Sequence, residues 1–400
     1  MNQAPPTDQD MTAFDVLDQA LKAEGPAAAL GRLIGLLEER DEPRALLDAL
    51  LLKARHELGL PLIQAGSLGE LVEPVRTQYE DRYIEAIRTV GQRLLDRGDI
   101  PSAWPYFRAI GEKERVAAAI EAFEPADGDT QVSAVVEVAF NQGAHPRKGF
   151  ALILDHFGAC SAITAFEHLP PDDAHRVPSA DRLVRHIHAH LTASLRAEIG
   201  RRGKPLPPEG TSITALIAGR DWLFMDDAYH LDVSHLAATV RISPMLTDPA
   251  TIRLAAELTD YGRRLSSMHR YECEPPFDRL YEDHAVYLRA LLGQEVDDAI
   301  AHFLSKIPPR EPGAPLHPAD SLPAQILVQL LVRLDRIGQA IDVASEHLAD
   351  LPESSLICPS VSQLCQRAGL PDRLAQVARD NGDLVNYTAA ILEPKGPASP

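Results

Sequence analysis

Two histidines and an aspartate near the middle of the chain have the residue types of a metal site. His230, Asp232 and His235 fall in the segment DWLFMDDAYHLDVSH, and imidazole with carboxylate is a ligand set that Zn or Fe accepts. Histidines five residues apart cannot share one helical face, so a common metal requires His230 to lie in a loop before a helix. The structural alternative makes Asp232 the N-cap of a helix that runs through Val240.

A second group of chemistry-bearing residues surrounds a pair of prolines. Glu272 and Glu274 lie just before Pro275-Pro276, and His284 follows them. Carboxylates in unlike surroundings can divide general acid and general base work, because their pKa values separate. We therefore take Glu272, Glu274 and His284 as candidate catalytic residues. The alternative is that the acidic residues here supply favourable charge near the start of the next helix.

A third segment, residues 176–204, is basic within an acidic chain. It carries seven Lys and Arg residues against two acidic ones. Such a stretch could meet an acidic partner or another part of the same chain, and the alternative is a solvated face. Its His186 and His190 are one helical turn apart, a spacing able to chelate a metal. They also flank an apolar stripe, so the alternative for them is the border of a buried face.

The sequence motifs that identify common enzyme classes are absent. There is no GxxxxGK[ST] phosphate loop, no GxGxxG after a strand, no GxSxG elbow, no HExxH and no zinc-finger spacing of Cys and His. An enzyme would therefore have to assemble its site from residues 221–284, as a helical metal-dependent or acid–base enzyme. The gathering of histidines and carboxylates in a region without repeats is the feature that favours this alternative.

The elements that must position these groups are helices. Ala and Leu dominate the composition, aromatic residues make up only 5%, and apolar residues recur at intervals of three and four. The spacing of Leu183, Ile187 and Leu191 predicts one such helix through the basic segment. The prolines of residues 170–180 predict a linker before it.

Three segments have the pattern of helix hairpins, namely residues 91–107, 288–303 and 331–352. In each, an apolar helix is followed by a Gly turn and then by a small residue four positions before another apolar or small one. Gly permits the tight turn, and Ala lets the second helix approach the first closely. The pairs are Ala103/Phe107, Ala299/Phe303 and Ala340/Ala344.

In these hairpins the sequence resembles the tetratricopeptide-repeat family and its relatives among the α-solenoids. That family places Gly at the turn, Ala early in the second helix, an aromatic residue four later and Pro at the end. Gly98, Ala103 and Phe107 match the turn and second helix, and Ala340 and Pro352 match the interval from Ala to Pro. The resemblance implies stacked helix hairpins and no particular activity.

We therefore expect an all-α fold of antiparallel helix hairpins, stacked as a TPR-like α-solenoid with an irregular central insert. The central insert is where the hairpin rhythm breaks and His and mixed charge accumulate. The expected parts are a disordered N-terminus (1–10), an N-terminal repeat region (11–170), a central non-repeat region (171–284), a C-terminal TPR-like region (285–392) and a disordered tail (393–400).

The charge of the chain excludes several classes of partner. The 39 Lys and Arg residues face 58 Asp and Glu residues, which gives a formal net charge of −19 at pH 7. We expect no binding to nucleic acid or to anionic lipid, since both require a basic face. The N-terminal residues lack the basic and apolar regions of a secretory signal, and no stretch of about 18 residues is free of charge. With four scattered cysteines, these features predict a cytoplasmic protein without a membrane span.

The function that this pattern favours is a scaffold that binds a protein or peptide, because stacked hairpins form an extended groove. Arg and aromatic residues contribute most of the binding energy at interfaces. The candidate partner-binding residues are Arg182, Arg185, Trp222, Tyr229, Arg263 and Arg264. The pattern does not indicate an oligomeric state, and a cofactor, Zn or Fe, enters only with the enzyme alternative.

Overall fold

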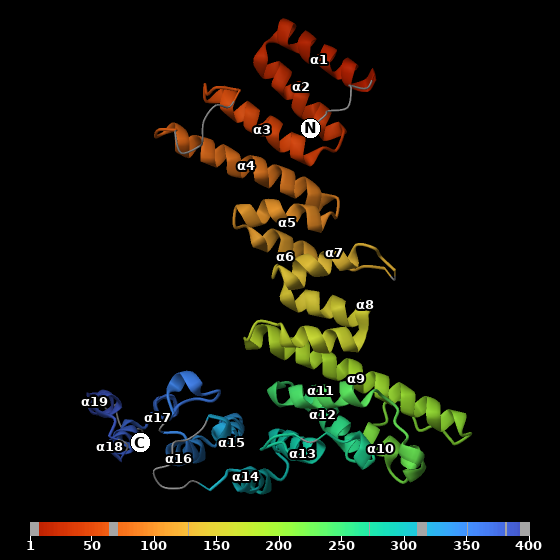
Figure 1. Cartoon of the computed structure of the whole chain (residues 1–400), viewed down its shortest axis with the longest axis vertical. Coiled ribbons are helices and arrows are strands. Elements are labelled where there is room, and N and C mark those ends of the chain that lie inside the picture. The colour runs from red at the N-terminus through yellow and green to blue at the C-terminus, as the bar shows by residue number, and fades with distance from the viewer. Residues whose placement is uncertain are drawn as a thin grey trace. The chain divides into compact units, whose positions relative to one another are not determined.

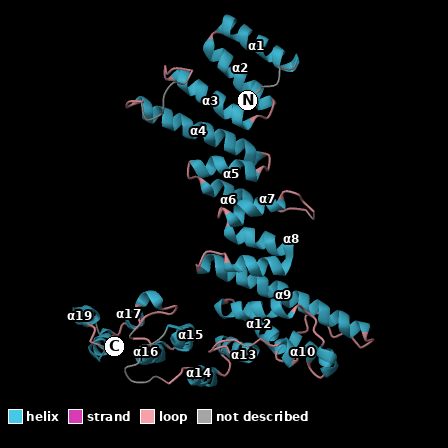
Figure 2. Cartoon of the chain, in the orientation of Figure 1, coloured by secondary structure: helices cyan, strands magenta, loops and turns pink. Residues whose placement is uncertain are grey.

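The computed structural model describes residues 8–63, 71–126, 128–271, 273–309, 318–349, 351–380 and 382–392. Across these residues the regular elements are helices, and no β-strand occurs (Figures 1 and 2). Most helices pack against the next helix along the chain. The predicted all-α class is therefore confirmed. Of the two expected disordered ends, residues 1–7 and 393–400 lie outside the described residues, and Asp8 already begins the first helix.

The chain divides into two compact units, the first ending at His156 and the second beginning at Phe157. The division falls inside α8 (Pro146–Glu167), which is interrupted at Gly158 with φ 80° and ψ 178°. Glycine adopts this backbone conformation without the steric penalty of a side chain. The expected boundaries at residues 170/171 and 284/285 separate repeat from non-repeat regions, and they stay predictions beside this division into compact units.

The first unit is a succession of short helices. Gly25, at φ 89°, separates the first two, and Pro26 begins the second, where its missing N–H has no helical partner to lose. The sequence pattern favours one helix over residues 101–122, but the structure breaks it at Gly111, which has φ 75°. The helices are α1 (Asp8–Glu24), α2 (Pro26–Glu39), α3 (Pro43–Glu57), α4 (Val75–Asp96), α5 (Ile100–Ala109), α6 (Lys113–Glu121), α7 (Val132–Val136), a π-helix (Glu137–Asn141) and the start of α8.

The first predicted hairpin forms between α4 and α5. Gly98 makes the turn with φ 77°, and Ala103 and Phe107 are fully buried. A Cβ atom added to Gly91 would lie 2.8 Å from the Phe107 ring, so the two helices approach as closely as a glycine allows. The Gly98 turn and the buried Ala103 and Phe107 therefore agree with the sequence pattern, whereas the close approach at Gly91 was not part of it.

The second unit contains the central region and the two remaining hairpins. In α13/α14 and α15/α16 the small residues Ala299, Ala340 and Ala344 are buried, and each pair of helices is in contact. Its helices are α9 (Asp173–Arg201), α10 (Ile213–Ile217), η3 (Asp221–Asp227, a 3₁₀-helix), α11 (Val233–Ile242), η4 (Ser243–Met245), α12 (Pro249–Gly262), η5 (Ser267–His269), α13 (Leu280–Leu291), α14 (Val296–Ser305), η6 (Pro318–Ser321), α15 (Leu322–Arg333), α16 (Ile337–His347), η7 (Glu353–Ser355), α17 (Val361–Ala368), α18 (Pro371–Asp380) and α19 (Leu384–Leu392).

The central region is organised around the long helix α9, as the apolar stripe predicts. Leu183, Ile187 and Leu191 are fully buried, and α9 contacts α10, α11 and α12 (Figure 1). The linker expected over residues 170–180 is mostly helix instead. The Asp172 side chain accepts a hydrogen bond from the His175 amide at 3.0 Å, and this cap starts α9 well before Pro178.

Helix α8 is the one helix among the described residues with the length and apolar composition needed to cross a membrane. In its most apolar stretch, 39% of the residues are buried within the protein. The helix is also interrupted at Gly158. One helix of this kind is weak support for a membrane span.

Candidate functional site

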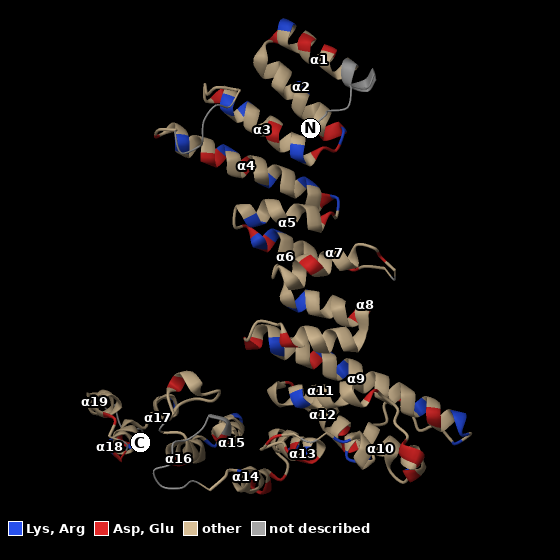
Figure 3. Cartoon of the chain, viewed as in Figure 1, with Lys and Arg blue, Asp and Glu red and all other residues tan. Residues whose placement is uncertain are grey.

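An open hollow of about 670 Å³ lies between the C-terminal half of α9 and the loop that precedes α11. It is lined by His190 and Glu198 from α9 and by Tyr229 and His230 from the loop. Two segments that are distant in the sequence and bear histidines therefore meet at one surface. In Figure 3 the ribbon at this end of α9 carries the blue of Lys and Arg.

The loop that forms one wall has an unusual backbone. Asp226 and Asp227 are consecutive residues with φ 55° and 56°, the left-handed region that few residues other than glycine adopt. The loop is held from outside, because His269 Nε2 donates to the Asp227 carbonyl at 3.0 Å. The Tyr229 ring also packs edge-on against His269, with 5.0 Å between the ring centroids. These contacts fix Tyr229 at the rim, with 55% of its surface exposed.

His230 is held by a buried tyrosine at the base of the loop. Its backbone amide donates to Tyr261 Oη at 2.8 Å, and its ring Nδ1 lies 3.1 Å from the same oxygen. Burial raises the pKa of Tyr261, so its hydroxyl stays protonated and donates a hydrogen bond to Nδ1. We infer that the proton of the neutral imidazole sits on Nε2. Burial also lowers the pKa of His230, which nearby Glu198 offsets only in part.

Two arginines hold the one carboxylate of α9 that lines the hollow. Arg202 Nε donates to Glu198 at 3.0 Å and Arg201 Nη2 at 2.5 Å. Hydrogen bonding from Arg202, followed by the charges of both arginines, lowers the pKa of Glu198 and keeps it ionised. The Arg202 guanidinium also stacks on Trp222, with 5.3 Å to the ring centroid. Each guanidinium has five N–H donors, and Glu198 takes only one from each.

Asp232 is the N-cap of α11, as the structural alternative predicts. Its carboxylate accepts from the Ser234 amide at 2.8 Å, the Ser234 hydroxyl at 2.6 Å and the His235 amide at 3.4 Å. The bonds from Ser234 lower the pKa of Asp232. Within the described part of the chain, no group of three or more His, Cys, Asp or Glu residues is placed to hold a metal ion. His230, Asp232 and His235 thus make no three-ligand set in this geometry.

The candidate catalytic residues of the proline-rich segment are not at this hollow. His284 is 2% exposed, and its ring stacks on Phe277 with 4.0 Å between centroids. Its Nδ1 donates to the Leu280 carbonyl at 2.7 Å, and burial lowers its pKa to about 4. His284 is therefore a neutral core residue with no open path to a substrate. Glu274 is exposed, and Glu272 lies outside the described residues.

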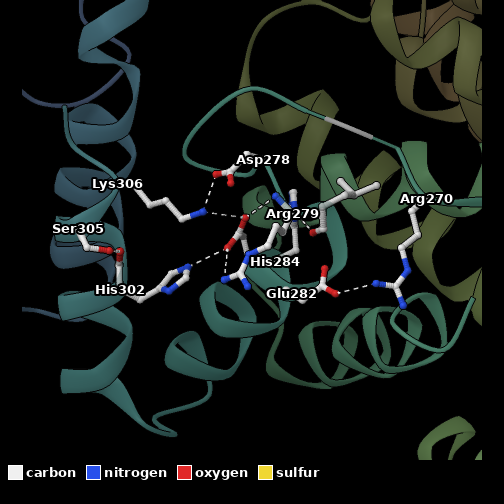
Figure 4. Close-up of polar contacts among 10 residues, drawn as sticks. Arg270, Asp278, Arg279, Glu282, His284, His302, Ser305 and Lys306 are labelled. Atoms are coloured by element: carbon white, nitrogen blue, oxygen red, sulfur yellow. Dashed lines mark hydrogen bonds and ion pairs between the residues drawn. The ribbon is translucent and has the colours of Figure 1, made fainter. Parts of the chain in front are cut away.

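Asp283, the residue before His284 in the chain, is completely buried. Figure 4 shows residues of this region, with the Lys306 side chain pointing toward Asp278. His302 Nε2 donates to Oδ1 of Asp283 at 2.8 Å, and the Arg279 amide donates to Oδ2 at 2.7 Å. Lys306 Nζ reaches the same carboxylate at 3.3 Å and Asp278 at 2.5 Å. We call these five residues the Asp283 cluster. It ties the start of α13 to the end of α14.

Of the six candidate partner-binding residues, two lie at the hollow. Tyr229 lines it, and Trp222 lies under Arg202 beside it. The other four are engaged within the chain. Arg185 pairs with Asp181 and Asp248, Arg263 with Asp260, Arg264 with Asp221, and Arg182 also has an internal interaction.

Glu198, Arg201, Arg202 and Tyr261 are not among the site residues that the sequence predicts. Glu198 and Arg202 are four residues apart on a helix, and this spacing would have predicted their ion pair. No local pattern places Tyr261 under His230, because the two are 31 residues apart and meet only through packing.

Comparison with known proteins adds no relative. No family model matches the chain, no curated protein matches it, and no solved structure matches it. Only the side chains of the hollow therefore indicate what it could bind.

Proposed function

We propose that this chain is a helical-repeat protein that binds a protein or peptide partner, and that the hollow beside α9 is its docking site. The observation that carries the proposal is the combination found there. An exposed tyrosine, two arginines with spare donors and a base formed by Leu223 and Leu231 line one open surface. Tyr, Trp and Arg are the residues that most often dominate binding energy at interfaces.

The TPR-like arrangement belongs to this proposal. Its support is the set of contacting helix pairs with a buried small residue in the second helix, at Ala103, Ala299 and Ala340. Arrays of such hairpins present extended binding surfaces. We also propose a cytoplasmic location, on the sequence features given above.

The acid–base alternative has one observation in its favour, the neutral imidazole of His230 close to the Glu198 carboxylate. Two arginines hold that carboxylate ionised, so its usual role as a proton acceptor is opposed. Peptide binding would use Tyr229 and the spare donors of Arg201 and Arg202, whereas proton transfer would use only His230 and Glu198.

Selection from a random linear peptide library displayed on phage tests the proposal. The full chain is the bait, and Tyr229→Ala/Arg202→Ala is the variant bait. Arg253→Ala, at an exposed arginine of α12, is the matched control. We expect peptides enriched on the wild type to be retained by the control and lost on the double variant. Selection of no peptide, or of peptides that bind the double variant equally well, would contradict the proposal.

A further inference from the structure

We propose that the hollow recognises an acidic peptide segment, with an Asp or Glu carboxylate received by Arg201, Arg202 and His230 and an adjacent apolar residue packed on Tyr229. This inference rests on the proposed function and names the ligand class of the same site. The reason is that the hydrogen-bond acceptors of the hollow already have donors within the protein, whereas most of its N–H donors have no acceptor there.

The carboxylate acceptors of the hollow already receive hydrogen bonds from within the protein. Both oxygens of Glu198 accept from arginine, Oε1 from Arg202 and Oε2 from Arg201. Asp232 is occupied by the N-terminus of α11, where two amides and a hydroxyl donate to it. A cationic ligand would have to compete with these internal hydrogen bonds for the carboxylates of Glu198 and Asp232.

The donors of the hollow are largely unused. The side chains of Arg201 and Arg202 are 75% and 57% exposed, and each gives one nitrogen to Glu198. His230 points Nδ1 at buried Tyr261, which leaves its Nε2–H on the opposite edge of the ring. The hollow therefore has an excess of N–H donors, and carboxylate is the group in proteins that accepts from arginine with matching geometry.

The charges of the hollow oppose a dianion more than a monoanion. Glu198 and Asp232 carry two negative charges, which Arg201 and Arg202 balance. A carboxylate adds one negative charge to this balanced set, whereas a phosphate adds nearly two beside two existing carboxylates. The monoanion is the better match. The apolar residue of the peptide ligand would pack on Tyr229 at the rim, whose ring is held edge-on against His269.

The test uses fluorescence anisotropy with the full chain and three labelled peptides, in which Glu, Gln or phosphoserine alternates with Leu. We expect the Glu peptide to bind at least about tenfold more tightly than the Gln peptide, since hydrogen bonds to charged groups contribute about 1.5–3 kcal/mol. In Arg201→Ala/Arg202→Ala this preference should disappear, while Arg253→Ala should keep it. Arg202→Lys, which keeps the charge but loses the planar fork, should show an intermediate preference.

Several results would overturn the inference. Equal affinity for the Glu and Gln peptides would do so, as would binding of the phosphoserine peptide alone or a preference that survives in the double variant. If library peptides bind at the hollow but the Glu peptide does not, this inference fails and the proposed function stands. If no library peptide binds, the proposed function fails as well. Thermal melting of the three arginine variants, which alter exposed side chains, checks that each remains folded.

Discussion

The hollow beside α9 and the Asp283 cluster are built from the same kinds of side chain. Each combines a carboxylate with histidine and with basic residues. In the cluster, Asp283 is fully buried and its donors His302 and Lys306 are only 22% and 15% exposed. In the hollow, Arg201 and Arg202 are mostly exposed and keep unused donors.

The difference shows that residue type does not separate structural polar groups from binding groups. What separates them is whether hydrogen-bonding capacity is left over at a surface that a partner can reach. A buried charge must be fully compensated within the fold, because its desolvation otherwise opposes folding. At a solvent-facing site water satisfies the spare donors until a ligand replaces it. We therefore expect substitutions in the cluster to change stability and substitutions in the hollow to change binding.

The largest effect should come from Asp283→Asn. It removes the charge that compensates the Lys306 ammonium in a buried setting, and breaking a buried pair costs about 3–5 kcal/mol. Urea unfolding followed by circular dichroism measures the change. The matched control is Glu282→Gln, which weakens a partly exposed pair with Arg270 at 3.3 Å and should cost less than about 1 kcal/mol. Equal, small effects of the two substitutions would show that the cluster is not a structural unit.

A second effect, on the pH dependence of stability, should come from His284. Its pKa is about 4 in the folded protein because it is buried, against about 6.5 in an unfolded chain. The unfolded state therefore binds more protons between these values, and the free energy of unfolding should fall as the pH drops from 6.5 toward 4. The contribution is of the order of 3 kcal/mol. His284→Gln should reduce this slope by the contribution of His284, and the lowered pKa of His230 should keep a smaller slope of the same sign. His190→Gln, at the exposed rim of the hollow, should keep the contribution of His284. An unchanged slope in His284→Gln contradicts the assignment.

A third, smaller effect should come from packing beside the cluster. A Cβ atom at Gly262 of α12 would lie 2.2 Å from the Tyr281 ring, which precedes Glu282 and Asp283 on α13. Gly262→Ala should therefore destabilise by about 1–3 kcal/mol through overpacking. Gly338→Ala, in a helix with nothing within 4 Å of the new Cβ, should be neutral or stabilise by up to about 1 kcal/mol. Thermal melting of both variants checks the sign of each change.

The smallest effect on stability is expected in the hollow. Arg201→Ala and Tyr229→Ala alter exposed side chains, and such substitutions usually change the free energy of unfolding by no more than about 0.5 kcal/mol. The same urea titration measures them. A loss as large as that of Asp283→Asn would mean that the hollow is a structural element and would remove the contrast between the two regions.

Local signals in the sequence predicted a substantial part of the fold. The apolar stripe of α9, the N-cap at Asp232 and the helix-approach positions at Ala103 and Ala340 all appear where the sequence places them. Each depends on spacing within one helix or one hairpin. The break at Gly111 was missed because Gly is tolerated within helices, and only its φ of 75° ends the helix.

The site was predicted less well, for a physical reason. The sequence singled out His230 and Tyr229, but not the side chains that give them a role. Tyr261 of α12 binds His230, and Glu198 of α9 lines the hollow, so both contacts depend on packing between segments far apart in the sequence. His284 has the residue type of a catalytic group, and only its burial against Phe277 identifies it as core.

Hydrogen–deuterium exchange of the full chain, with and without the Glu/Leu peptide, tests the contrast between the two regions most directly. We predict that bound peptide slows amide exchange at residues 228–232 and at the C-terminal turns of α9, where the hollow lies, and leaves the Asp283 cluster unchanged. Unchanged exchange around the hollow at saturating peptide, or slowing confined to residues 278–284, would contradict the account.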